Sequence, residues 1–208
     1  MGNAERIIEI ITADSERVAV LRAVASLGLP EAWIAGGYIR NPVWDVVCQA
    51  SEKNSGTDID VVYFRPLDDY GISEEELIAR IRADEMNPVW EEEEAARKKL
   101  EQMIPGLEYE VKNQARMYFS SARTVQHKQY RSLSEAVSGW VETATATGVR
   151  LNNDGSYSVL APYGTEDLFA GIIRPTNSTS EYKERAHKRA EKKGWLKRWP
   201  TLRFADPL

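Results

Sequence analysis

The chain has 208 residues, with 27 Lys and Arg against 32 Asp and Glu, two His and one Cys. Its 42% hydrophobic and 28% charged residues are average for a globular domain. A mean hydropathy of -0.47 and the lack of a long apolar run predict that no segment spans a membrane. No basic leader precedes an apolar block, and Cys48 has no internal disulfide partner, so we expect a cytoplasmic protein. Since zinc prefers His and Cys ligands, any bound metal should be a hard cation held by carboxylates, such as magnesium.

Apolar spacing predicts alternating helices and strands. Residues 5–27 have a helical pattern that ends at Gly28, with a possible interruption at Asp14-Ser15, since both residues favour caps and turns. Further helices are predicted over residues 39–51, 73–85, 89–103, 113–123 and 133–147. Strands are predicted over residues 32–35, 57–64, 107–112, 149–151 and 157–160, with a last strand or short helix over 167–173. This order predicts an α+β fold, a mixed β-sheet flanked by helices.

The C-terminal segment differs in composition from the rest of the chain. Between Glu181 and Arg198 there are eight basic and three acidic residues, so this stretch has a formal charge of +5 within a chain of -5. We expect one core domain over residues 1–175 and a basic extension over 176–208 that docks on it. The extension is interpreted as a solvated helix, with attraction of an anionic acceptor such as an RNA end as the alternative.

Asp58 and Asp60 are the sharpest chemical feature of the sequence. Residues two apart in a strand point to the same side, so both carboxylates should lie on one face. They would repel each other unless a cation lay between them, and carboxylate-bound magnesium ions are a known device for phosphoryl transfer. An ordinary exposed strand edge is the alternative.

The glycine pair Gly36-Gly37 lies between a predicted strand and a predicted helix. Glycines there let backbone N–H groups approach a phosphate, and the helix N-terminus adds a favourable dipole. Arg40 follows one turn later and could contact the same anion, or form a structural ion pair with Asp45. A glycine pair by itself often marks only a turn.

Glu110 lies in the strictly alternating segment 107–112, which predicts a strand with one buried and one exposed face. Glu108 and Lys112 share its face. A carboxylate from this strand would complete a metal site beside the aspartates, with Glu108 as the fallback. Exposed strands also commonly contain Glu without any such function.

The order of these motifs resembles the nucleotidyltransferase superfamily that includes DNA polymerase beta. Residues 36–41 are similar to the Gly-Gly-x-Val-Arg-Asp motif of the CCA-adding enzyme head domain. The closest resemblance is to the bacterial nucleotidyltransferase family 6, through residues 33–41, 44–45, 58–64, 110–117, 142–151, 161–164, 167–169, 195–196 and 198–200. The chain departs from that pattern in having two glycines at 36–37, Tyr118 where His is common, and a longer acidic helix at 89–103.

The resemblance implies an enzyme that transfers a nucleoside monophosphate from an NTP, such as ATP, to a hydroxyl of an RNA, protein or small molecule, releasing pyrophosphate. It implies two magnesium ions, with manganese as the alternative. The catalytic and metal-binding residues it implies are Asp58, Asp60 and Glu110. The nucleotide-binding residues it implies are Gly36, Gly37, Arg40, Asn113 and Arg116. Asn113 and Arg116 could instead only cap a strand-to-helix junction, and the whole chain could be a non-catalytic nucleotide-binding module that retains the fold.

Overall fold

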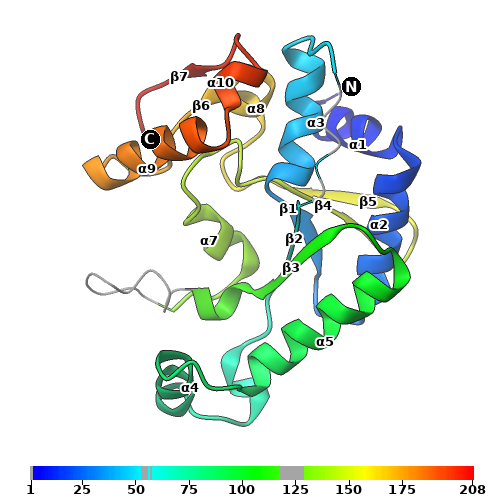
Figure 1. Ribbon diagram of the computed structural model, residues 1–208, viewed down its shortest axis with the longest axis vertical. Coiled ribbons are helices and arrows are strands. Elements are labelled where there is room, and N and C mark those ends of the chain that lie inside the picture. The colour runs from blue at the N-terminus through cyan, green and yellow to red at the C-terminus, as the bar shows by residue number, and fades with distance from the viewer. Residues whose placement is uncertain (1, 53–55, 57, 118–128) are drawn as a thin grey trace.

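A mixed β-sheet forms the centre of the computed structural model, which describes residues 2–52, 56, 58–117 and 129–208 (Figure 1). Within these residues, five strands pair in the order β3-β2-β1-β4-β5, with β2 and β3 parallel and the other neighbours antiparallel. The strands are β1 Trp33–Ala35, β2 Asp58–Tyr63, β3 Glu108–Asn113, β4 Gly148–Leu151 and β5 Tyr157–Leu160. The predicted mixed sheet is confirmed.

Helices cover both faces of this sheet. The helices are α1 Asn3–Thr12, α2 Ser15–Ala25, α3 Gly37–Val47, α4 Glu74–Arg82, α5 Pro88–Met103, α7 Leu133–Ser138, α8 Glu166–Phe169, α9 Ser180–Lys192 and α10 Trp195–Arg198. In Figure 1, α7 lies on the opposite side of the sheet from α2. No helix in the described ranges has the length and apolarity needed to cross a bilayer.

Alternate residues of β2 face two different hydrophobic layers. Ile59 and Val61 are fully buried in the main core, which α1, α2, α3 and α5 also line. Val62 belongs to a second core that includes residues of α7. Because successive strand residues point to opposite faces, Asp58 and Asp60 lie on the α7 face of the sheet.

The ends of several elements follow from local caps. Asp14 does interrupt the first helical pattern, because its side chain accepts hydrogen bonds from the backbone of Glu16 and Arg17 and begins α2. Helix α3 begins at Gly37, two residues earlier than predicted, directly after β1 and Gly36. Ser73 caps α4, because its side chain accepts a hydrogen bond from the backbone N–H of Glu76.

Two predicted helices differ in the structure. Of the helix expected over 113–123, the described part begins with the 3-10 turn Gln114–Arg116 and continues into a helical Met117; the residues from 118 onward, Tyr118 included, lie outside the described ranges. The helix expected over 133–147 ends at Ser138. The following segment bonds to residues far along the chain instead of to itself: Thr143 N donates to Arg174 O, and Thr176 N donates to Val141 O.

The C-terminal region packs against α3 through two tryptophans, one at the start of α10 and one directly after it. Trp195 and Trp199 are each 2% exposed and meet Trp44 edge to face, with ring centroids 5.3 and 5.2 Å away. Trp199 Nε1 also donates to Asp45 Oδ1 at 2.8 Å. Two short strands, β6 Ile172–Ile173 and β7 Arg203–Phe204, pair in parallel beyond these helices. The basic helix α9 is therefore held near the sheet by buried tryptophans that follow it.

Candidate active site

Three carboxylates lie together on the neighbouring parallel strands β2 and β3. The register places Asp58 beside Glu108 and Asp60 beside Glu110. These four acidic side chains are on the α7 face of the sheet. The residues between and after them in β2 and β3, which have odd numbers, point to the opposite face and are buried in the main core. Asp58 and Glu110 are exposed, and Asp60 is half-buried. The structure thus brings together the three acidic residues singled out from the sequence.

Asp60 has the most unfavourable environment of the three. Burial, together with the negative charges of Asp58 and Glu110, raises the pKa of Asp60 to about 6. Burial acts to raise the pKa of Glu110 as well, but the hydrogen bond and charge of Lys112 outweigh it and lower that pKa. Lys193 lies 3.8 Å from Asp58 Oδ2. Ammonium groups therefore compensate the outer carboxylates, and a bound cation would relieve the repulsion at Asp60.

Gly36 occupies the turn between β1 and α3, directly against this cluster. Its φ of +67° is in the left-handed region that favours glycine. A Cβ at this position would lie 2.6 Å from Asp60 Oδ2 and 3.7 Å from Trp140 Cζ3. Gly37 is the first residue of α3, so the glycine pair brings the helix N-terminus up to the carboxylates.

Arg40 lies beneath this turn in a fully enclosed position. Its guanidinium carbon lies 4.5 and 4.2 Å from the ring centroids of Trp44 and Trp195, and Nη1 donates to Thr145 Oγ1 at 2.6 Å. Burial lowers the pKa of Arg40 to about 10, although the charge of Glu142 opposes that shift. Even at that value Arg40 is cationic at neutral pH, so it places a positive charge close to the glycine pair.

Three cavities meet at the carboxylates. Any two of these cavities have one of the three carboxylates in common. The glycine cavity, about 270 Å³, is lined by Gly37, Tyr38, Arg40, Asn41, Gly56, Asp58, Asp60, Thr145, Arg189, Lys193, Trp195, Arg198 and Trp199. The aromatic cavity, about 320 Å³, is lined by Asp60, Val62, Glu110, Lys112, Gln114, Met117, Tyr130, Ala136, Gly139, Trp140, Val141, Thr145, Tyr182, Arg185 and Arg189.

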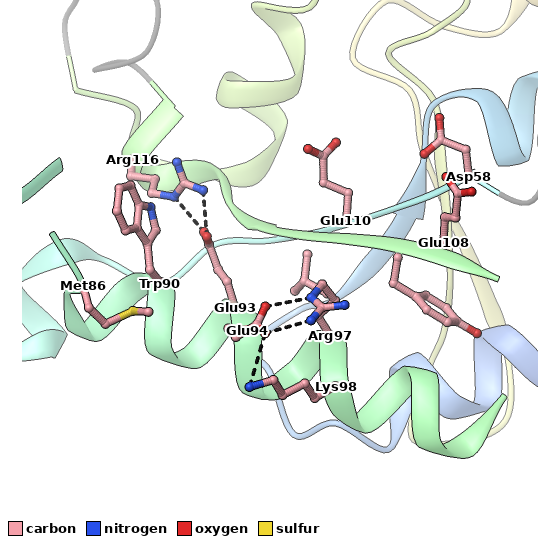
Figure 2. Close-up of a pocket in the computed structure, with 12 residues that line it drawn as sticks. Asp58, Met86, Trp90, Glu93, Glu94, Arg97, Lys98, Glu108, Glu110 and Arg116 are labelled. Atoms are coloured by element: carbon pink, nitrogen blue, oxygen red, sulfur yellow. Dashed lines mark hydrogen bonds and ion pairs between the residues drawn. The ribbon is translucent and has the colours of Figure 1, made fainter. Parts of the chain in front are cut away.

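The third, the α5 cavity, is about 720 Å³ and lies between β3 and α5 (Figure 2). It is lined by Asp58, Met86, Trp90, Glu93, Glu94, Arg97, Lys98, Glu108, Tyr109, Glu110, Val111 and Arg116. Asp58 therefore borders the glycine and α5 cavities, Asp60 borders the glycine and aromatic cavities, and Glu110 borders the aromatic and α5 cavities. A group held at this junction would be open to ligands from three sides.

The C-terminal region contributes cations to the site that sequence reasoning did not assign. Arg189, Lys193 and Arg198 all line the glycine cavity. Helix α9, which contains Arg189, also places Tyr182 and Arg185 on the aromatic cavity. The spacing 182, 185, 189 and 193 puts these residues on one helical face, which is the signal that could have found them.

Asn113 and Arg116 lie apart from the glycine cavity and have protein partners. Asn113 is fully buried; its side chain donates to Arg65 O and accepts from the backbone N–H groups of Arg65 and Ala115. Arg116 forms two hydrogen bonds of 2.7 Å to the carboxylate of Glu93 on α5, as Figure 2 shows. Arg116 borders the α5 cavity, whereas Asn113 connects β3 to the segment after β2.

The donor set suits a hard cation. Magnesium prefers carboxylate oxygens, and the pKa of Asp60 is raised first by burial and then by the negative charges of Asp58 and Glu110, which a cation would offset. Within the described ranges, no three acidic, His or Cys side chains already converge as a metal cluster. Lys112 and Lys193 instead contact two of the carboxylates.

Comparison with known proteins identifies the family and the fold of the chain. A family model described as nucleotidyltransferase matches residues 22–87 and 83–204. A solved NMR structure described as revealing a CCA-adding enzyme head domain matches with a TM-score of 0.72 and 29% identity, covering 97% of this chain and 95% of that chain. No curated protein matches the chain significantly.

Two CCA-adding enzymes match more distantly. A complex with CTP has 15% identity and a TM-score of 0.49, covering 92% of this chain and 46% of that chain. An apo form has 16% identity and a TM-score of 0.45, covering 86% of this chain and 42% of that chain. The fold is that of the CCA-adding enzyme head domain, as the structure with the higher similarity indicates.

Proposed function

The chain belongs to the nucleotidyltransferase family, and we propose that it transfers a nucleoside monophosphate from an NTP to an acceptor hydroxyl. The observation that supports this most is the junction of three cavities at Asp58, Asp60 and Glu110. Nucleotidyl transfer needs separate space for a triphosphate, a nucleoside and an acceptor around one phosphorus atom. Family membership supports NTP-dependent transfer in general, and the geometry suggests where each part lies.

The triphosphate would lie in the glycine cavity. Arg189, Lys193 and Arg198 border it, and Arg40 supplies a buried positive charge below the glycine pair. The N-terminus of α3 points its first-turn amides toward the same space, where its dipole favours an anion. Together these groups would neutralise the phosphates and hold the α-phosphate beside Asp58 and Asp60.

Asp58 and Asp60 would hold magnesium, with Glu110 as the third carboxylate. Bound magnesium would supply charge neutralisation for the phosphates and the developing pyrophosphate. The rest of the catalytic contribution is alignment, because phosphoryl transfer requires little covalent chemistry from the protein. Manganese has the same preference for oxygen ligands and would be accepted at the same positions.

The acceptor would approach from the α5 cavity, which Asp58 and Glu110 border. Its hydroxyl oxygen would form a new bond to the α-phosphorus as the bond to pyrophosphate breaks. The hydroxyl proton would leave toward Glu110. The wall of this cavity has five carboxylates and three cationic side chains, so a polyanion such as RNA gains no net attraction from it. We therefore favour a protein or small-molecule acceptor over RNA.

Incubation with α-labelled NTPs, magnesium and fractionated cell extracts tests the proposal. We expect labelled products from the wild-type protein and from Asp154→Asn, which changes an exposed turn carboxylate that borders none of the three cavities. Asp58→Asn and Asp60→Asn should produce none. The proposal fails if all four proteins label the same products equally. Magnesium-dependent NTP binding without transfer to any acceptor fraction would instead support a non-catalytic nucleotide-binding module.

A further inference from the structure

The aromatic cavity combines flat rings with positive charge. Tyr130, Trp140 and Tyr182 line it, together with the cationic side chains of Lys112, Arg185 and Arg189. These residues come from β3, α9 and the segments on either side of α7. Proteins bind nucleobases by stacking them on aromatic side chains beside positive charge. Every base can stack in this way, because every base has a π-face.

This cavity adjoins the glycine cavity. Asp60, Thr145 and Arg189 border both cavities, so these side chains lie at the boundary between the two spaces. Trp140 reaches this boundary, because its Cζ3 lies 3.7 Å from the position that a Cβ at Gly36 would occupy. A nucleotide with its triphosphate in the glycine cavity and its α-phosphate at Asp60 would thus extend its nucleoside along Trp140.

Gln114 provides a polar contact inside the aromatic cavity. Its side chain is 2% exposed, and Trp140 Nε1 donates to Gln114 Oε1 at 3.4 Å. An indole N–H can only donate, so the amide oxygen must face Trp140. The amide NH₂ then has no hydrogen-bond partner among the residues that the structure describes. Gln114 lines the aromatic cavity, so this donor could bind an acceptor on a ligand there, and nucleobase oxygens and ring nitrogens are acceptors.

The α5 cavity fits a base less well. It has one tryptophan, Trp90, and borders the glycine cavity only through the exposed Asp58. Five carboxylates surround it, including Glu93, Glu94 and Glu108, which would disfavour the electron-rich carbonyls of a base.

We propose that the aromatic cavity binds the nucleobase of the NTP, with the base stacked on Trp140 and Tyr182 and Gln114 donating a hydrogen bond to it. This inference rests on the proposed function, because it assumes that an NTP occupies the glycine cavity. It assigns α9 a role on two sides of the site, since Tyr182 contacts the base and Arg189 lies between base and triphosphate.

Calorimetry with two probes tests the assignment. The probes are inorganic tripolyphosphate and NTP analogues with a non-cleavable α,β linkage, each with magnesium. Trp140→Ala should weaken analogue binding by about tenfold, the loss of one stacking contact, and leave tripolyphosphate binding unchanged. Tyr182→Ala, which also removes the hydrogen bond from the Tyr182 hydroxyl to Gly139 O, should act in the same direction. Gln114→Leu should reduce analogue affinity severalfold. Trp90→Ala is the matched control and should change neither affinity.

Several results would overturn the assignment. Loss of both affinities in equal proportion would mean that the variants damage the site as a whole. Loss through Trp90→Ala but not through Trp140→Ala or Tyr182→Ala would place the base in the α5 cavity. Wild-type protein that binds tripolyphosphate as tightly as the analogues has no base site. If the wild-type protein binds neither probe, the proposed function itself is contradicted. If Trp140→Ala and Tyr182→Ala still transfer nucleotides with an unchanged KM for the NTP, only this inference is contradicted.

Discussion

Arg189 on α9 donates from Nε to Oε1 of Glu142 at 2.9 Å, and Glu142 is almost fully buried. The other carboxylate oxygen of Glu142 has no hydrogen-bond partner in the described structure. The pair links the C-terminal helix to the segment that follows α7. Its two members have different surroundings, because the Arg189 side chain is 39% exposed and the Glu142 side chain only 1%.

Arg189→Met should therefore destabilise the fold as well as weaken NTP binding. The variant leaves the Glu142 carboxylate buried with a weaker compensating charge, and we expect a loss of about 3 kcal/mol in the free energy of unfolding. Adding Glu142→Gln should restore most of that stability in urea denaturation. NTP affinity should stay low in the double variant, because the cation is still missing. Equal recovery of both quantities would contradict a binding role for Arg189.

Gly36→Ala should abolish transfer, because the new methyl group would displace the Asp60 carboxylate. Gly155 is a matched control: its φ is +83°, but nothing lies within 4 Å of a Cβ there. Both variants should lose about 1–2 kcal/mol of stability from left-handed strain. Only Gly36→Ala should reduce turnover, by about 100-fold or more. Similar turnover in the two variants would show that the close contact between Gly36 and the Asp60 carboxylate is not needed for catalysis.

Asp60→Asn should stabilise the metal-free protein while removing its activity. The substitution relieves the repulsion among Asp58, Asp60 and Glu110, and a gain of about 1 kcal/mol corresponds to a rise in Tm of about 2–4 °C in EDTA. Magnesium should raise the Tm of the wild type and of Asp154→Asn, whose carboxylate borders none of the three cavities, and have little effect on Asp60→Asn. A lower Tm for Asp60→Asn in EDTA would mean that the carboxylate stabilises the fold.

Lys193→Ala should raise the KM for the NTP severalfold and make it less sensitive to salt, because one cation bordering the glycine cavity is lost. Lys188→Ala changes a lysine of the same helical region that pairs with Glu184 and does not border the cavity. We expect no change in KM there. Steady-state kinetics at two ionic strengths separate the two variants, and an equal effect of both would indicate only a general loss of positive potential.

Arg40→Lys should lower the free energy of unfolding by about 2 kcal/mol. A lysine cannot stack on Trp44 and Trp195 while also donating to Thr145, as the planar guanidinium does. Arg22→Lys, on the exposed side of α2, is the control and should be neutral. Thermal unfolding followed by tryptophan fluorescence reports directly on this cluster. Unchanged stability would mean that the ammonium group replaces the guanidinium fully.

Parts of this arrangement could be predicted because they depend on neighbouring residues. Asp14 begins a helix through its own side chain, whatever the rest of the chain does. The alternation within β2 puts Asp58 and Asp60 on the face opposite Ile59 and Val61, since the period of a strand is two. The order of these motifs along the chain also identified the family before any contact was known.

Other parts depend on contacts between distant segments. The predicted helix over 133–147 stops at Ser138, because residues 141–143 bond to residues 174–176. The side chain of Asn113 donates a hydrogen bond to Arg65 O, and that of Arg116 donates to the carboxylate of Glu93 on α5. Neither contact leaves a signal in the local sequence, so both residues were predicted only from the resemblance to the family.

The sequence by itself determined which chemistry is available: carboxylates in place of His and Cys ligands, a glycine turn before a helix, and a face of the sheet on which the acids gather. Tertiary structure alone decided what surrounds that chemistry. Packing of Trp195 and Trp199 on Trp44 brings the basic helix α9 to the carboxylates and encloses Arg40. Strand and helix periodicity are local properties of the chain, whereas the burial of an aromatic cluster depends on which distant side chains fill the same space.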